Sequence, residues 1–190
     1  MITRLLILFF LQSVTYLSAE NSLIRMPQIS PNAQEMAFSF QGDIWIYNFK
    51  THQTKRLTIH QGYESNAIWN TYGDQLVFSS NRKGTNNIFT ISKNGGTPKQ
   101  LTFYPTADTP SDWTASDQIV FSTNRVQKGP EWDEQIYQVN ANGGTPQRFI
   151  TALGSMATVS PNGNLVAYVK GACRISREDY SGPAQRDVWI

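Results

Sequence analysis

One unit of sequence recurs four times along the 190-residue chain. Each copy contains a short apolar run that ends in an aromatic residue, and these residues are spaced 40, 43 and 47 positions apart: Phe38, Phe78, Phe121 and Tyr168. A second run follows each of them and also carries an aromatic residue: 43–46, 87–90, 135–138 and 187–190. A period of this length is typical of proteins built from repeated structural units.

Two further elements complete the unit. A third run places an apolar residue twelve positions after the aromatic residue of the second run, at Leu57, Leu101 and Phe149. A short strand-like segment also precedes each copy, beginning near residues 27, 67, 111 and 157. Each copy therefore predicts four short antiparallel strands, which is the composition of a propeller blade.

The turns agree with this interpretation. The sequence Asn-Gly-Gly-Thr-Pro occurs at 94–98 and again at 142–146. Glycine adopts positive φ at little steric cost, and proline cannot donate to a strand ladder, so we expect a hairpin turn followed by an outer strand. No segment after residue 20 shows the apolar spacing of a helix. A sandwich would not need the same aromatic position in every unit, and a solenoid would have a shorter period.

The sequence thus predicts an all-β fold, an incomplete β-propeller of about four four-stranded blades. We expect a signal peptide at 1–19 and a partial propeller at 20–190, with blades at about 27–66, 67–110, 111–155 and 156–190. The chain ends inside the strand at 187–190, and a closed six-bladed ring needs on the order of 260 residues. We therefore expect the sequence to be a piece of a longer protein.

The first nineteen residues differ from the rest of the chain. Arg4 precedes an apolar run from Leu5 to Leu11, and the small residues before Glu20 predict cleavage after Ala19. This is the layout of a secretory signal peptide, with an uncleaved membrane anchor as the alternative. Either interpretation places the remaining residues across the membrane, and cleavage predicts a periplasmic or secreted protein that does not contact the membrane.

Composition excludes several classes of function. Charged residues make up 16% of the chain and the net charge is +2, with no run of Lys or Arg, so nucleic-acid binding is not expected. Cys173 is the one cysteine, so no internal disulfide can form. We expect this thiol to be buried, or else paired with a partner.

No pattern of residues predicts catalysis. His52 and His60 lie in different loops without zinc-ligand spacing. Glu131, Asp133 and Glu134 surround Trp132 in the longest insertion, where a solvated acidic loop is the commoner outcome and a Ca²⁺ site the alternative. The chain lacks a nucleophile elbow, a phosphate loop and a dinucleotide fingerprint. We expect no catalytic, cofactor or metal residues, and we expect the blade tryptophans to pack in sheets: Trp45, Trp69, Trp113 and Trp189.

Several of these motifs resemble a known repeat. Ser-Pro-Asn at 30–32 and 160–162, Asp-Ile-Trp at 43–45 and Arg-Leu-Thr at 56–58 are similar to the WD-like repeats of TolB and of the N-terminal propeller of tricorn-type proteases. Asn stands where the family turn usually has Asp, which turn chemistry tolerates. The stretch at 37–45, followed by 56–66, and the stretch at 180–190 look more like tricorn than like TolB.

The resemblance implies a non-catalytic segment of an exported tricorn-like serine peptidase, whose nucleophile follows a PDZ-like domain far downstream. The propeller face would gate or scaffold the access of peptides or proteins, and the parent protein could be a homo-oligomer. A TolB-like periplasmic module that docks envelope proteins is the alternative, although few residues precede the first predicted strand. The propeller of a prolyl-oligopeptidase-type hydrolase is a third option. Because loops set the specificity of propellers, the fold alone cannot name a ligand.

Overall fold

The computed structural model describes residues 23–125, 134–171 and 185–190, which form strands and turns without a helix. Within these ranges, fifteen strands make four antiparallel sheets in chain order. The first sheet contains β1 (Arg25–Ile29), β2 (Glu35–Phe40), β3 (Asp43–Asn48) and β4 (Gln53–Arg56). The second contains β5 (Glu64–Trp69), β6 (Gln75–Lys83), β7 (Thr85–Ser92) and β8 (Lys99–Gln100). The third contains β9 (Asp108–Trp113), β10 (Gln118–Thr123), β11 (Gln135–Asn140) and β12 (Gln147–Leu153), and the fourth contains β13 (Ser155–Val159), β14 (Val166–Lys170) and β15 (Asp187–Trp189).

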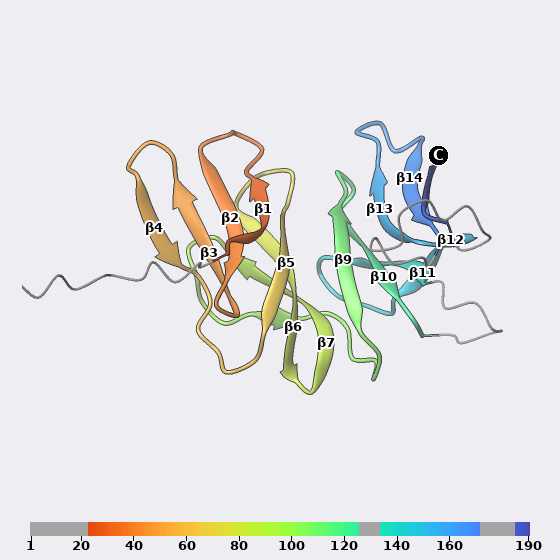
Figure 1. Ribbon diagram of the computed structural model, residues 1–190, viewed down its shortest axis with the longest axis horizontal. Coiled ribbons are helices and arrows are strands. Elements are labelled where there is room, and N and C mark those ends of the chain that lie inside the picture. The colour runs from red at the N-terminus through yellow and green to blue at the C-terminus, as the bar shows by residue number, and fades with distance from the viewer. Residues whose placement is uncertain (1–22, 126–133, 172–184) are drawn as a thin grey trace, which may run out of the picture.

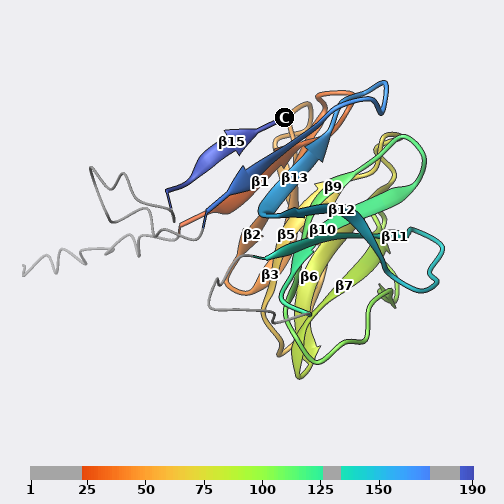
Figure 2. The ribbon, with the colours of Figure 1, turned by 90° about the vertical axis from the view of Figure 1, so that its right-hand side faces the viewer.

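The four sheets follow one another as the blades of a β-propeller, which confirms the predicted fold class (Figure 1). The first strand of each blade contacts the first strand of the next, so β1, β5, β9 and β13 form the inner row. The view in Figure 2 places β15 beyond β14 at the edge of the fourth sheet. Each blade is therefore an up-and-down meander, and successive blades meet face to face.

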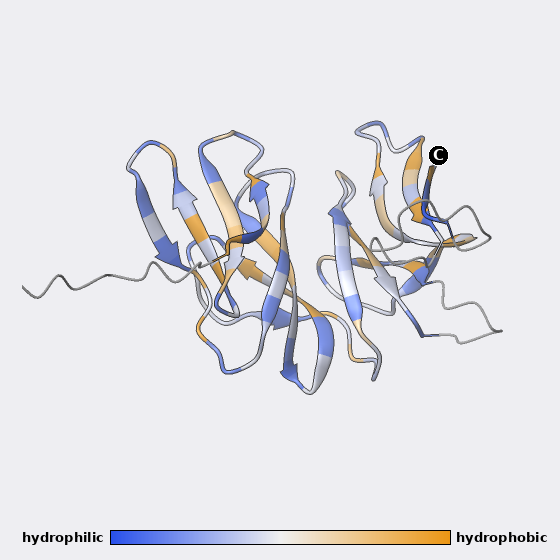
Figure 3. Cartoon of the chain, in the orientation of Figure 1, coloured by the Kyte–Doolittle hydropathy of each residue, from blue (hydrophilic) through white to orange (hydrophobic). Residues whose placement is uncertain are grey.

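The hydrophobic core lies between the blades. One cluster joins the first and second sheets and contains Ala37, Ile46 and Phe78, while a second joins the second and third sheets around Val77 and Phe121. Apolar colour follows the central strands in Figure 3, whereas the outer strand β4 is mostly polar. Because both faces of the second and third sheets are buried in this way, their central strands read as apolar runs instead of alternating ones.

The inner strands begin earlier than the sequence predicts. β5 begins at Glu64 and not near residue 67, and β13 begins at Ser155 and not near 157. A register shift interrupts these strands, with positive φ at Asn66 and Met156, and the same shift places Met26 at positive φ in β1. A β-bulge of this kind reverses the inside–outside alternation, so the residues before it do not fit the repeat pattern.

The predicted hairpin turns are confirmed. Gly95 and Gly96 have φ of 98° and 112°, and Gly143 and Gly144 have φ of 100° and 121°. The outer strands β8 and β12 start directly after the prolines that follow these turns. Positive φ at these four positions is the conformation that favours glycine.

The tryptophans divide into two groups. Trp69 and Trp113 are buried in the clusters between blades, as predicted, and Trp45 is half-buried in β3. Trp189 is 47% exposed, and the Nζ atom of Lys170 lies 4.5 Å from its ring centroid. The prediction of sheet packing therefore holds for the first three residues and not for Trp189.

Some predictions fall on residues that the structure does not describe. They are the signal peptide at 1–19 with cleavage after Ala19, the acidic loop residues Glu131, Trp132 and Asp133, the thiol of Cys173, and the part of the tricorn-like stretch at 180–184. Within the described ranges, no helix is long and apolar enough to cross a membrane.

Candidate binding site between the first and second blades

The connections between blades and the turns β2–β3 and β6–β7 lie at one end of the sheets, which we call the connection end (Figure 1). The lengths of these turns differ between the first and second blades. The β2–β3 ladder ends at the pair Phe40–Asp43, which leaves a two-residue turn. In the second blade the strands continue beyond the equivalent pair Ser80–Asn87 as far as Lys83–Thr85. The first blade is therefore the shorter one at this end.

A cleft of about 610 Å³ opens above the short turn. It lies between the start of the inner strand, the β2–β3 turn and the β4–β5 connection, and its lining is Leu23, Arg25, Ser39, Phe40, Gln41, Gly42 and residues 60–63. The second blade places the longer β6–β7 hairpin at the equivalent position. We name this hollow the blade 1–2 cleft.

The β4–β5 connection is anchored to the first blade by Asp43. One carboxylate oxygen of Asp43 accepts from the backbone N–H of His60 at 3.3 Å, and the other accepts from Nε of Arg56 at 3.0 Å. The Arg56 guanidinium lies 5.9 Å from the Trp45 ring centroid. In addition, Oγ1 of Thr58 accepts from the backbone N–H of Ile44 at 2.9 Å.

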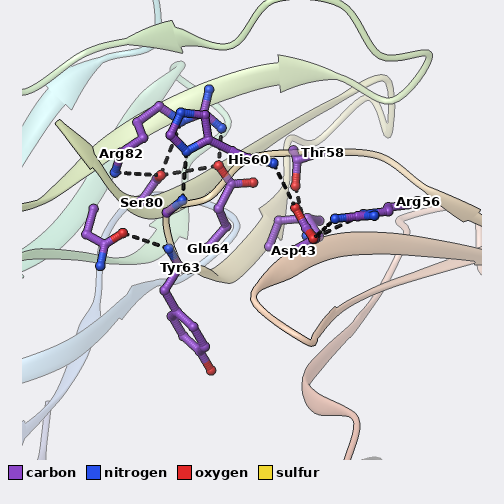
Figure 4. Close-up of polar contacts among 11 residues, drawn as sticks. Asp43, Arg56, Thr58, His60, Tyr63, Glu64, Ser80 and Arg82 are labelled. Atoms are coloured by element: carbon purple, nitrogen blue, oxygen red, sulfur yellow. Dashed lines mark hydrogen bonds and ion pairs between the residues drawn. The ribbon is translucent and has the colours of Figure 1, made fainter.

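The same connection is anchored to the second blade. The backbone N–H of Tyr63 donates to Oδ1 of Asn81 at 2.6 Å, and the N–H of Asn81 donates to the carbonyl of Tyr63 at 3.2 Å. A Cβ at Gly62 would lie 2.8 Å from that same Oδ1 and 2.9 Å from Cα of Arg82, so only glycine fits there. The loop between His60 and Tyr63 is therefore tied to both blades, as Figure 4 shows.

A buried ion pair lies directly below this loop. Glu64 is fully buried, and its Oε1 accepts from Oγ of Ser80 at 3.2 Å and from the Arg82 guanidinium (Figure 4). That guanidinium lies 5.0 Å from the ring centroid of Phe89, a cation–π geometry. Oε2 of Glu64 has no hydrogen-bond partner among the described residues. Burying a charge in this way is tolerable only because Arg82 pairs with it.

Two polar residues at the lining of the cleft differ in how they are exposed and paired. Ser39 is 2% exposed and lines the cleft, yet its Oγ makes no hydrogen bond within the described part of the chain. Arg25 is exposed, and the ion pairs of the described residues do not include it. The lining contains neither Asp nor Glu, while the nearby carboxylates of Asp43 and Glu64 are each paired with their own arginine. Arg25 thus gives the described lining residues a positive formal charge.

The candidate residues that the structure describes, His52, His60 and Glu134, lie in separate places. His52 lies in the β3–β4 turn, where its Nδ1 is 2.9 Å from the Tyr47 hydroxyl, and His60 lies at the other end of the same sheet. No group of potential metal ligands occurs in the described ranges. Glu134 lies just before β11, and its carbonyl accepts from the N–H of Gly154 at 2.8 Å. The remaining acidic-loop residues lie outside the description.

Sequence reasoning did not single out Arg25, Ser39 or the Glu64–Arg82 pair. A signal for the pair does exist, because Asp108 and Arg125 form the same kind of pair in the third blade, with the guanidinium 2.7 Å from Oδ2. The acid precedes the arginine by eighteen positions in one blade and by seventeen in the other. A comparison of charged residues between repeats, instead of apolar ones, would have revealed it.

The chain forms four meandering sheets that pack face to face, with a loop-lined cleft at one end. This architecture defines the protein as a β-propeller. The model of the tricorn protease N-terminal β-propeller domain matches residues 21–190, and the chain belongs to this family.

Individual proteins agree with this assignment. The chain is 31% identical over 166 residues to the Tol-Pal system protein TolB of Francisella tularensis subsp. tularensis (strain WY96-3418), an alignment covering 82% of this chain and 37% of that protein. Among solved structures, the tricorn protease superposes with a TM-score of 0.73 at 16% identity, over 88% of this chain and 17% of that one. TolB from Acinetobacter baumannii superposes with a TM-score of 0.65 at 18% identity, over 88% and 43%. The chain thus spans well under half of each of these relatives.

Proposed function

We propose that this chain is a non-catalytic propeller segment of an exported, tricorn-like serine peptidase, and that it scaffolds or gates the access of peptide substrates. The observation that carries the proposal is the blade 1–2 cleft, which lies at the connection end and is lined by loop residues of mixed polarity. Propellers place their specificity in such loops, while the blades supply a rigid frame. Family membership supports the connection to a peptidase.

The cleft has the properties that an extended peptide requires. It offers an aromatic surface at Tyr63, which is 46% exposed, together with amide groups at Gln41 and Gln61. Tyrosine gives a large contact area at low conformational-entropy cost, and amides can pair with a peptide backbone. The floor is held by the anchored loop, so a peptide would meet a preorganised surface.

The first test is the reading frame beyond Ile190. Continuation through further blades into a PDZ-like and serine-peptidase region supports the gating role, and a stop codon immediately after Ile190 would contradict the peptidase part of the proposal.

The second test measures binding separately from cleavage. The full natural protein is inactivated with diisopropyl fluorophosphate, and the binding of a labelled unfolded peptide pool is followed by fluorescence anisotropy. We expect binding to persist after inactivation and to weaken several-fold in Tyr63→Ala, because the aromatic contact is lost. Complete loss of binding on inactivation would place all peptide recognition in the catalytic region. Lys50→Gln, in the turn at the opposite end of the same sheet, serves as the control.

The alternative is a TolB-like periplasmic module that docks envelope proteins. The identity of 31% to a Tol-Pal system protein favours it. The two functions differ in what accompanies the propeller and in what it captures. Three results would favour this alternative. The reading frame would end after the last blade, the protein would cross-link to folded envelope proteins in cells, and it would not bind unfolded peptides.

A further inference from the structure

We propose that the bulges of the inner strands hold a site of methionine oxidation by peroxides. Met26 and Met156 are the thioethers that react first, and Asn66 directs the oxygen to one side of the Met26 sulfur. The product at each position is methionine sulfoxide. The inference goes beyond the proposed function and does not depend on it, because it concerns a covalent modification and not a bound peptide.

Both methionines occupy the same place in their blades. The register of β1 against β2 shifts at Met26, and that of β13 against β14 shifts at Met156. The two residues have positive φ, 51° and 55°, and Asn66 has a φ of 57° at the equivalent bulge of the second blade. A bulge of this kind re-aims the side chain of its extra residue. The two thioethers therefore leave the strand ladder at matching positions of the inner row.

These two side chains are open to solvent. The chain contains four methionines, of which the structure describes Met26, Met36 and Met156. Met26 is 52% exposed and Met156 is 63% exposed, whereas Met36 in β2 is half-buried. An oxidant in solution has to reach the sulfur atom, so we expect the two bulge methionines to react before Met36.

The two exposed sulfur atoms differ in their neighbours. Nδ2 of Asn66 donates to Sδ of Met26 at 3.7 Å, where β1 and β5 lie side by side. At Met156 the backbone N–H donates to Oγ of Ser122 at 3.0 Å, and no hydrogen bond of the described residues reaches the sulfur. A thioether sulfur has two lone pairs, and the Asn66 amide covers one of those of Met26. The oxidant then meets the other lone pair, so Met26 gives mainly one of the two sulfoxide epimers.

The reaction is a two-electron transfer of oxygen from a hydroperoxide. A sulfur lone pair attacks one peroxide oxygen, and the S–O bond forms as the O–O bond breaks. The leaving oxygen takes up a proton, which gives water when the oxidant is hydrogen peroxide. The sulfur is oxidised by two electrons and the peroxide is reduced by two. A flexible apolar side chain thereby becomes a polar and chiral one, which changes the chemistry of the inner row at Met26 and Met156.

The first test measures which methionines react. The full natural protein is treated with a limiting amount of hydrogen peroxide, and each methionine is followed by mass spectrometry after digestion. A glutamate-specific protease cleaves at Glu35 and so separates Met26 from Met36. We expect Met26 and Met156 to be oxidised several-fold faster than Met36 in the folded protein, and all three to react at similar rates in concentrated urea. Equal rates in the folded protein, or a faster Met36, would overturn the oxidation site.

The second test measures the epimers on the same peptides. It uses two methionine sulfoxide reductases, each of which reduces one epimer. At Met26 we expect one enzyme to restore most of the methionine and the other to restore little, whereas each enzyme should restore about half at Met156. After oxidation in urea, Met26 should behave like Met156. An even division at Met26 in the folded protein would overturn the role of Asn66.

Asn66→Gly assigns the epimer preference to the amide. Glycine accepts the positive φ of this position at little steric cost, and it removes the donor. The division at Met26 should become even, while that at Met156 stays as it was. A preference at Met26 that survives in this variant would show that another group covers the sulfur. Circular dichroism and an unfolding curve check that the variant is folded, and the comparison of Met26 with Met156 in the natural protein decides the proposal if it is not.

Discussion

The junction between the first and second blades and the junction between the second and third are built on the same plan. In both, a threonine after the outer strand accepts from a backbone N–H at 2.9 Å: Ile44 to Thr58 and Ile88 to Thr102. In both, a lysine Nζ reaches a carbonyl of the next blade at 2.7 Å: Lys55 to Asn94 and Lys99 to Asn142. The threonine contacts hold the start of each connection to its own blade, and the lysine contacts join neighbouring blades.

The two junctions differ in how completely their polar groups are satisfied. Asp108 uses both carboxylate oxygens on Arg125, at 3.3 and 2.7 Å, whereas Glu64 uses only Oε1. Ser79 is hydrogen-bonded and Ser39 is not, within the part of the chain that the structure describes. Among the described residues, Ser79 and both Asp108 oxygens at the second junction are therefore hydrogen-bonded. At the first junction, Ser39 Oγ and Glu64 Oε2 have no hydrogen-bond partner.

The largest expected effect on stability is at the Asp108–Arg125 pair of the third blade. Arg125→Met removes the partner of a fully buried carboxylate, and we expect the free energy of unfolding to fall by about 3–5 kcal/mol. Urea denaturation measures it. The double variant Asp108→Asn/Arg125→Met should recover much of the loss, because no uncompensated charge remains. A single variant that unfolds like the wild type would show that the pair does not stabilise the third blade.

Gly62→Ala addresses the loop at the junction between the first and second blades. The new methyl group would approach Asn81 and the backbone of Arg82 at less than 3.0 Å, and we expect a loss of about 1–3 kcal/mol from overpacking. Thermal unfolding of this variant should be compared with that of Gln61→Ala, whose side chain is exposed next to it. If the two variants unfold alike, the loop is free to move away from the second blade.

The two equivalent serines provide a direct contrast. Ser79→Ala removes a buried hydrogen bond to Asp108 and should cost about 1 kcal/mol. Ser39→Ala removes a buried hydroxyl without a partner among the described residues, so stability should stay unchanged or rise slightly. Denaturation midpoints of both variants, measured without peptide, check this. Equal losses at the two positions would mean that Ser39 is already satisfied in solution.

The smallest effect is expected at the ion pair of the first blade, in which the arginine is partly exposed although Asp43 is buried. The Arg56 side chain is 42% exposed, and Asp43 keeps its hydrogen bond from the His60 N–H when the guanidinium is removed. Because the Arg56 side chain borders solvent, its removal lets water reach the Asp43 carboxylate, and Arg56→Ala should cost only about 1 kcal/mol, well below the loss in Arg125→Met. The same denaturation experiment in high salt should show a still smaller difference between variant and wild type. A loss as large as that of Arg125→Met would contradict the comparison.

The repeat pattern of the sequence was sufficient to predict the fold. Aromatic residues such as Phe78 and Phe121 mark central strands because both faces of these strands are buried, and the Asn-Gly-Gly turns follow from backbone sterics alone. The starting residues of the inner strands were harder to predict. The bulges at Met26, Asn66 and Met156 reverse the inside–outside alternation on which strand prediction depends. Their starting residues therefore came from the structure.

The candidate site was not predictable in the same way. Arg25 and Ser39 are single polar residues on neighbouring strands, and only the register of β1 against β2 brings them together. The cleft depends on the shorter β2–β3 turn of the first blade. A comparison of the residues that all repeats share does not detect this difference in turn length. His60 was noted as a loop residue of the tricorn-like stretch, and it does lie at this cleft, where its backbone anchors the loop to Asp43.

The bulges of the inner strands have a consequence for how the chain avoids aggregation. Each inner strand presents one unpaired edge toward its neighbours in the row, and a flat edge of this kind would pair with any other extended chain. A residue at positive φ within the strand turns the local N–H and C=O groups out of line, as at Met26 and Met156. Several sheet edges can then stand next to one another in a single molecule without joining into one continuous sheet.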